Sequence, residues 1–210
     1  MIFNLTVKGN IMTTTSIVIL ASLIFLFFLV LFVIGIYNGL VTKKNHFKNS
    51  YSQIDVQLKR RYDLIPNLVA LVKEYMAHEK GTLEAVIAAR NQAAKAESHL
   101  AGNPSDGVAM QSLMAAESVL SSSLGKMFAL VEAYPELKAN ENMAQLQEEL
   151  TSTENKVGFS RQAFNDDVMD YNIFREKFPN NVVANQMGFK AAEPFNLTNL
   201  TERETPKVQF

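Results

Sequence analysis

The feature that most constrains this chain is an uncharged, apolar run near its N-terminus. Residues 17–36 read IVILASLIFLFFLVLFVIGI, and no charged residue occurs between Gly9 and Thr42. As a helix this run would be about 30 Å long, which matches the hydrocarbon core of a bilayer. Bulky residues persist to Tyr37, without the small residues that mark a signal-peptide cleavage site. The run therefore predicts an uncleaved transmembrane anchor, with a cleaved signal peptide or a buried core helix as the alternatives.

The lysines on either side of the run predict its orientation. Lys8 is the one basic residue before it, whereas Lys43, Lys44 and Lys48 follow it closely. Because cytoplasmic flanks of membrane spans are enriched in Lys and Arg, we expect a single-pass protein of the inner (plasma) membrane. Its N-terminus would lie outside and its C-terminal domain in the cytoplasm. Tyr37 and the three later lysines are expected at the membrane interface, against lipid headgroups.

The composition excludes several kinds of site. The 210 residues suit one domain plus a short appendage, and 20 basic against 21 acidic residues leave a net charge of −1. With no basic excess and no nucleic-acid-binding motif, nucleic acid is not expected as a partner. The chain has no cysteine, which excludes disulfides, Cys-ligated zinc and cysteine nucleophiles.

Apolar stripes with helical spacing follow the anchor. A stripe close to a coiled-coil heptad predicts a helix from Phe47 to about Met76. The same spacing predicts helices over about residues 83–98, 108–134 and 142–177, with Thr82 capping the first of these and Pro179 ending the last. AGNPSDG at residues 101–107 predicts a turn. A short helix ending at Gly188 and an extended tail at TPKVQF are expected to follow.

Long helices joined by short connections pack most simply as an antiparallel bundle. The predicted fold is therefore all-α: one transmembrane helix, an elongated antiparallel bundle of about four helices, and a short, partly extended tail. The predicted limits are residues 1–11 for an N-terminal tail, 12–37 for the anchor, 38–179 for the bundle and 180–210 for the C-terminal segment. The first helix is expected to run from the span into the bundle.

A basic triplet, Lys59, Arg60 and Arg61, lies inside the first predicted bundle helix. If that helix is continuous from Ile36, Lys59 lies about 35 Å beyond the span, well past the Debye length of about 8 Å. The triplet is therefore interpreted as a candidate protein contact, with acidic residues of another helix or of another subunit. A solvated face is the alternative.

Pro66 lies five residues after this triplet. Proline has no backbone N–H, so the carbonyl of Tyr62 loses its usual helical partner. The sequence predicts a bend of the helix between Tyr62 and Pro66.

Polar residues beside the apolar stripe of the last long helix are candidates for fixing helix register. Glu154 and Arg161 are seven residues apart, as are Asn165 and Asn172. Polar groups at a helix seam specify register because they demand hydrogen-bond partners. Arg90, in an alanine-rich helix, is expected to pair with one of the acids. A substrate pocket is the alternative reading of these residues.

No arrangement typical of catalysis or metal binding stands out. Glu74 and Glu79 lie near His78, but there is no HExxH motif and no second histidine at ligand spacing. Adjacent acids such as Asp166 and Asp167 point about 100° apart on a helix and form no facing dyad. We therefore expect no catalytic residue, no metal and no cofactor.

Several long sequence motifs of the chain resemble those of the LemA family. They run from residue 37 to the C-terminus and comprise YNGLV (37–41), SQIDVQLKRRYDLIPNLV (52–69), YMAHEKGTLEAVIAAR (75–90), VEAYPELKAN (131–140), LQEELTSTENKV (146–157), YNIFREKFPNNVVANQMGF (171–189) and the closing PKVQF. The resemblance implies a single-pass membrane protein with a cytoplasmic helical bundle, and it supplies no enzymatic activity. Some family members are linked to membrane remodelling or organelle formation, and genes for others neighbour membrane proteases.

The expected function is a membrane-anchored, non-enzymatic helical scaffold that forms homo-oligomers and organises or remodels membrane or partner proteins. Its expected partners are the lipid bilayer, further copies of the chain and a membrane protein. The first alternative is an adaptor of a membrane protease or an envelope-stress system. An enzyme with an unrecognised site is the second alternative.

Overall fold

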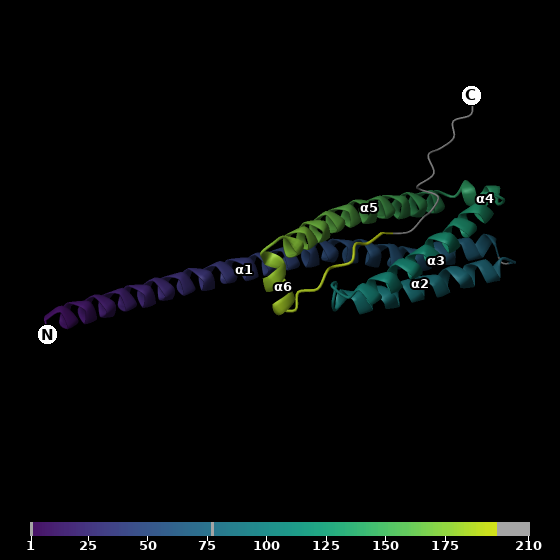
Figure 1. The fold of residues 1–210 in the computed structure, drawn as a ribbon. Coiled ribbons are helices and arrows are strands. Elements are labelled where there is room, and N and C mark those ends of the chain that lie inside the picture. The colour runs from purple at the N-terminus through teal and green to yellow at the C-terminus, as the bar shows by residue number, and fades with distance from the viewer. Residues whose placement is uncertain (1, 77, 197–210) are drawn as a thin grey trace, which may run out of the picture. The chain divides into compact units, whose positions relative to one another are not determined.

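The computed structural model describes the backbone of residues 2–76 and 78–196, and the side chains of residues 16–76 and 78–196. Within these ranges the regular structure is helical and contains no strand, so the all-α prediction is confirmed. The helices are α1 (Ile2–Tyr75), α2 (Lys80–Ala101), α3 (Gly107–Val131), α4 (Pro135–Lys138), α5 (Glu141–Glu176) and α6 (Asn180–Gln186) (Figure 1).

The chain divides into two compact units, which are described separately. The anchor unit contains Met1–Thr42 and Phe174–Lys190, and the bundle unit contains Lys43–Ile173 and the residues from Ala191 onward. Residues 174–190, which the sequence assigned to the bundle and the C-terminal segment, therefore belong with the predicted span. The prediction for TPKVQF falls outside the described residues.

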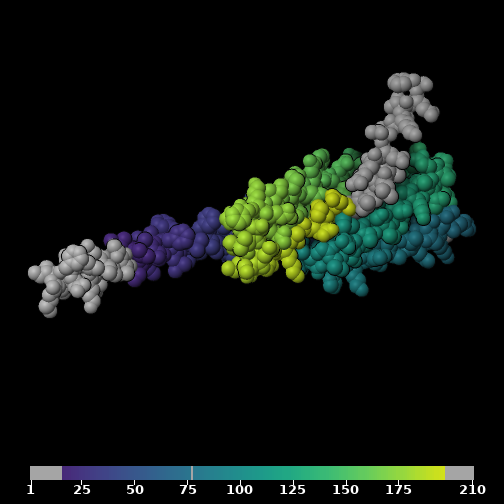
Figure 2. Space-filling view, viewed as in Figure 1, coloured from purple at the N-terminus to yellow at the C-terminus, as the bar shows by residue number. Residues whose placement is uncertain are grey.

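α1 is one unbroken helix, as expected, and it begins at Ile2 rather than near residue 12. Every side chain from residue 16 to residue 32 is exposed, with apolar side chains between 45% (Leu29) and 70% (Phe25) accessible. Figure 2 shows this purple part of α1 as a bare helix. In the part of the chain that the structure describes, α1 alone is long and apolar enough to cross a membrane.

In the bundle unit, α1, α2, α3 and α5 pack with their neighbours antiparallel. Lys43 of α1 pairs with Asp170 of α5, and Arg61 pairs with Glu154, so residue numbers rise along one helix as they fall along the other. The predicted stripe forms the core, because Ile54, Leu58, Ile65, Leu68 and Val72 are completely buried. Aromatic rings close one part of this core, with centroids 5.2 Å apart for Phe47–Tyr171 and 5.9 Å apart for Tyr51–Phe164.

The ends of α2 and α3 differ from the predicted helix limits. Thr82 is not the N-cap of α2, which begins at Lys80 after Glu79. α3 starts after Asp106, whose carboxylate accepts hydrogen bonds from the backbone N–H groups of Val108 and Ala109. α3 ends at Val131, before the predicted limit, because Pro135 occupies the first turn of α4, a position where its missing N–H costs nothing.

Candidate functional site

The three members of the basic triplet point to three different surroundings. Lys59 bonds Asp55 on its own helix at 2.8 Å and approaches Glu97 of α2 at 3.8 Å. Arg60 lies outside, 3.7 Å from the exposed Glu149 of α5. Consecutive helical residues project about 100° apart, so three adjacent cations do not form one patch. Lys59 and Arg60 are exposed, and their contact with another protein stays a prediction.

Arg61 is buried at the centre of the bundle, which corrects its prediction as a contact for another protein chain. Its guanidinium lies 2.9 Å from Glu117 of α3 and 2.8 Å from Glu154 of α5, and it also donates to the Ser121 hydroxyl. Tyr62 donates a hydrogen bond to the other oxygen of Glu117. The Arg61 guanidinium thus joins α1, α3 and α5. Its partners are acidic residues of other helices of the same chain, one of the two kinds of partner expected from the sequence.

Burial controls the electrostatics of this ionic centre. Burial raises the pKa of the Glu117 carboxyl, and the nearby Arg61 and the Tyr62 hydroxyl oppose that rise. Burial, reinforced by the negative charge of Glu117, also raises the pKa of the Tyr62 phenol. Such a centre is costly to break: without Arg61 the buried Glu117 loses its cation, and without Glu117 the buried Arg61 keeps only Glu154.

Arg90 supplies the missing partner at the proline of α1. Its Nε donates a 3.0 Å hydrogen bond to the Tyr62 carbonyl, the group that Pro66 deprives of its helical donor. Its guanidinium also lies 3.8 Å from Asp63, so Arg90 does not pair with Glu154 as expected. α1 continues as a helix through Pro66, and the bend between Tyr62 and Pro66 stays a prediction.

Asp55 and Glu97 form a pair of carboxyl groups between α1 and α2. Burial and a hydrogen bond with Asp55 raise the pKa of Glu97 to about 8. Although burial opposes it, hydrogen bonds with Glu97 and Lys59 lower the pKa of Asp55. These opposite shifts favour a proton on Glu97 and a negative charge on Asp55, beside the Lys59 ammonium.

Asn165 and Asn172 hold an extended segment, residues 191–196, that we name the strap. Each amide side chain binds one strap residue in both directions: Asn172 donates to the Ala192 carbonyl (2.9 Å) and accepts from its N–H (3.0 Å). Asn165 does the same with Phe195, at 3.3 and 2.7 Å. Asn165 and Asn172 are seven helical residues apart, and Ala192 and Phe195 are three extended residues apart. Both separations are about 10 Å, so each asparagine lies opposite one strap residue.

The strap passes between α5 and α3 (Figure 1), which fits the approach of Glu193 to Gly107 at the start of α3. The guanidinium of Arg161 lies over the Phe195 ring, 5.7 Å from its centroid. Glu154 and Arg161 therefore act separately, one at the ionic centre and one on the strap. The asparagines do demand hydrogen-bond partners, but they find them in the strap rather than in a neighbouring helix.

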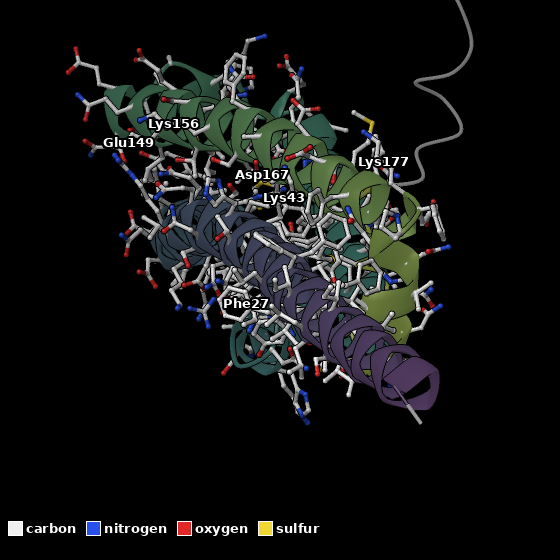
Figure 3. All side chains as sticks on the ribbon, turned by 60° about the vertical axis from the view of Figure 1, so that its left-hand side comes forward. Phe27, Lys43, Glu149, Lys156, Asp167 and Lys177 are labelled. Atoms are coloured by element: carbon white, nitrogen blue, oxygen red, sulfur yellow. The ribbon has the colours of Figure 1, made fainter. Side chains whose placement is uncertain are left out.

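The residues predicted at the membrane interface are placed as follows. Tyr37 packs edge-on against Phe189 within the anchor unit, with ring centroids 5.6 Å apart. Lys43 pairs with Asp170 at 2.5 Å, and Figure 3 labels Lys43 on α1 and Asp167 on α5. Lys44 and Lys48 are partly exposed. Their contact with headgroups stays a prediction.

Comparison with known proteins gives the family. The model of the LemA family matches residues 50–210, which is most of the chain and nearly all of its bundle. The chain belongs to the LemA family. Among its relatives are magnetosome protein MamQ of Magnetospirillum gryphiswaldense, 26% identical over 178 residues, and magnetosome protein MamQ 2 of Paramagnetospirillum magneticum, 27% identical over 178 residues. Each alignment covers 76% of this chain and 64% of the relative.

Sequence reasoning missed the acidic members of this LemA bundle, Glu97 and Glu117. A signal for them existed, because each fills a gap in an apolar stripe. Glu117 follows Leu113 by four residues and precedes Leu120 by three, and Glu97 stands in the same way between Ala93 and Leu100. A charged residue at a stripe position is buried with its helix face, so it requires a partner there.

The charged groups between the helices of this LemA-family bundle are buried and paired with one another. Arg61, Glu117 and Glu97 are buried, and their partners belong to the same bundle. No group of three or more metal-binding side chains occurs among residues 16–76 and 78–196. The arrangement connects helices through charge and hydrogen bonds.

Proposed function

We propose that this LemA-family chain is a non-enzymatic scaffold, held in a membrane by α1, whose bundle associates with copies of itself and organises membrane or partner proteins. The observation that carries the proposal is the uninterrupted exposure of the apolar side chains of residues 16–32. Exposed apolar surface of this extent is unfavourable in water. A bilayer removes that cost, and the length of the run fits one.

The ionic centre supports the non-enzymatic part of the proposal. Catalytic acids and bases need access to a substrate, whereas Arg61 and Glu117 are buried and bond each other at 2.9 Å. Their hydrogen bonds are used within the bundle. Tying α1 to α3 and α5 in one register gives the bundle a fixed surface, which a scaffold requires.

Self-association and orientation are the finer parts of the proposal. One span per chain confines every copy to the same membrane, which raises the effective concentration for lateral contacts between bundles. The relatives are magnetosome proteins, and for this chain we propose the organisation of a membrane surface. The lysines after the span support a cytoplasmic bundle at the inner membrane, the orientation that we propose.

The size of the detergent-solubilised protein tests the scaffold directly. We expect light scattering after size-exclusion chromatography to give a mass of several protein copies that falls on dilution. A monomer at every concentration contradicts self-association. A monomer that copurifies with one membrane protein at fixed stoichiometry favours the adaptor alternative. A reporter fused after Phe210 tests the orientation, because activity that requires export contradicts a cytoplasmic bundle.

A further inference from the structure

The anchor unit carries a second apolar surface besides the span. Phe178 is 83% exposed, and Val182 and Met187 are each more than half exposed. These residues lie on or beside the short helix α6, while Val183, Ala184 and Phe189 of the same segment are buried. The segment therefore packs on its own unit through one set of apolar side chains and presents another set outward.

Contacts within the anchor unit fix the segment at the end of the span. Phe189 packs on Tyr37, the residue directly after the apolar run of residues 17–36. A Cβ added at Gly39 would come within 2.7 Å of the Phe174 ring, so glycine permits this close approach. Arg175 donates to the Phe189 carbonyl at 2.9 Å, and Asn180 donates to the Phe174 carbonyl at 2.9 Å. These bonds hold both ends of α6.

The position of these contacts gives the depth of the segment in a membrane. Tyr37 and Gly39 follow Ile36, so they lie about 1.5 and 4.5 Å beyond the end of the span along the helix axis. The headgroup layer of a bilayer is about 5–7 Å thick on each side. In Figure 1, α6 runs across α1, as expected of a helix that lies in the plane of a membrane crossed by α1.

We infer that residues 178–187 form an in-plane membrane contact, an inference that rests on the proposed membrane anchoring by α1. Phe178, Val182 and Met187 enter the boundary between headgroups and acyl chains. Lys177 and Lys190, which are exposed at the two ends of the segment, face the phosphates. Lipid is the occupant because these exposed apolar side chains belong to the same unit as the exposed apolar side chains of α1.

The chain contains no tryptophan, so single Phe→Trp substitutions report on chosen positions. Three exposed phenylalanines form a matched set: Phe178→Trp tests the segment, Phe27→Trp tests the span and Phe159→Trp on α5 is the control. These side chains are 83%, 60% and 74% exposed. Each full-length variant is reconstituted into phosphatidylcholine–phosphatidylglycerol vesicles, and its fluorescence is quenched by brominated acyl chains or by aqueous acrylamide.

We expect brominated lipid to quench the tryptophans at positions 27 and 178, and acrylamide to quench that at 159. If position 178 behaves like 159 while position 27 is quenched by lipid, the inference fails and the anchor stands. If position 27 is itself quenched only by acrylamide, the membrane anchoring fails. A tryptophan at 178 that is shielded from both quenchers is covered by protein, for example by a second copy, and this outcome also overturns the inference.

Discussion

The span and the bundle differ in what covers their apolar side chains and in how far the identity of each residue matters. Between residues 17 and 36 nearly every side chain is apolar and those of residues 17–32 are all exposed, so the segment requires only apolar composition and sufficient length. In the bundle unit, one stripe of α1 is buried, and Arg61 within it is matched to Glu117 and Glu154. The bundle therefore depends on the identity of particular residues.

This difference predicts where a single substitution matters. In the span, one apolar residue can replace another, because lipid adapts to either shape. In the bundle, the same replacement leaves a cavity or an unpaired charge, because protein neighbours relax only partly. The predictions below test the contrast, from the largest expected effect to the smallest.

Removal of the Glu117 carboxylate is expected to have the largest effect. Glu117→Leu takes one of two carboxylate partners from the buried Arg61 and the acceptor from the Tyr62 hydroxyl. Together these losses should lower the free energy of unfolding by about 3–5 kcal/mol. Chemical unfolding in detergent, followed by circular dichroism, measures the loss. Glu132→Leu is the control, because the Glu132 side chain is largely exposed in its pair with Lys138 and should change little.

The double variant Arg61→Met/Glu117→Leu separates the two possible causes of that loss. If the cost comes from an uncompensated charge, an apolar pair of similar volume restores most of the stability. A double variant that is less stable than Glu117→Leu alone would show that Arg61 stabilises the bundle without Glu117, through Glu154 and Ser121.

The same substitution in the two halves of α1 gives the most direct contrast. Leu58 is completely buried in the bundle, whereas Leu26 is exposed in the span. Leu58→Ala should lower the free energy of unfolding of the bundle by about 2–5 kcal/mol. Leu26→Ala should leave that value unchanged. Equal destabilisation by both substitutions would mean that the span packs against protein in the folded chain.

The strap predicts a smaller effect. Asn172→Ala removes two hydrogen bonds to Ala192 and leaves its N–H and carbonyl unpaired, which should cost about 1–3 kcal/mol. Hydrogen exchange should show faster exchange of the Ala192 amide. Asn155→Ala, at an exposed position of the same helix, is the control. Unchanged exchange at Ala192 would show that Asn172 does not hold the strap.

A pH dependence centred on Glu97 is a separate prediction, of a slope rather than of a single free energy. Its pKa is about 8 in the folded chain, against 4.5 for an ordinary glutamate. Between these values the folded chain holds a proton that the unfolded chain has released, so its contribution to stability falls as pH rises from about 4.5 to about 8. Glu97→Gln keeps a neutral donor for Asp55 and should flatten this part of the profile.

Unfolding free energies measured at several pH values between 5 and 9 test this assignment. The exposed Glu84→Gln on the same helix should keep the wild-type slope. If Glu97→Gln also keeps it, the proton is not on Glu97.

The sequence was informative wherever a regular pattern carried the structure. The apolar run and the stripes were sufficient for the helices and for the bundle, because spacing alone determines which helix face is buried. The positions of Glu97 and Glu117 were missed because their partners lie on other helices, and helix-to-helix pairing is not encoded in local spacing. Asn165 and Asn172 were recognised as polar anchors, but their partner is an extended segment without a periodic signature.

The central claim is that lipid covers residues 17–32 and protein covers the stripe after it. Because the chain has no cysteine, single cysteines at successive positions 17–36 and 47–62 can carry a nitroxide in vesicle-reconstituted protein. Accessibility to oxygen, which enters the bilayer, is compared with accessibility to a nickel chelate, which stays in water. We predict oxygen access without nickel access throughout residues 17–32, and helical periodicity after residue 47 with Phe47, Tyr51, Ile54 and Leu58 protected from both. Nickel access along residues 17–32 equal to that at exposed bundle positions would contradict the account.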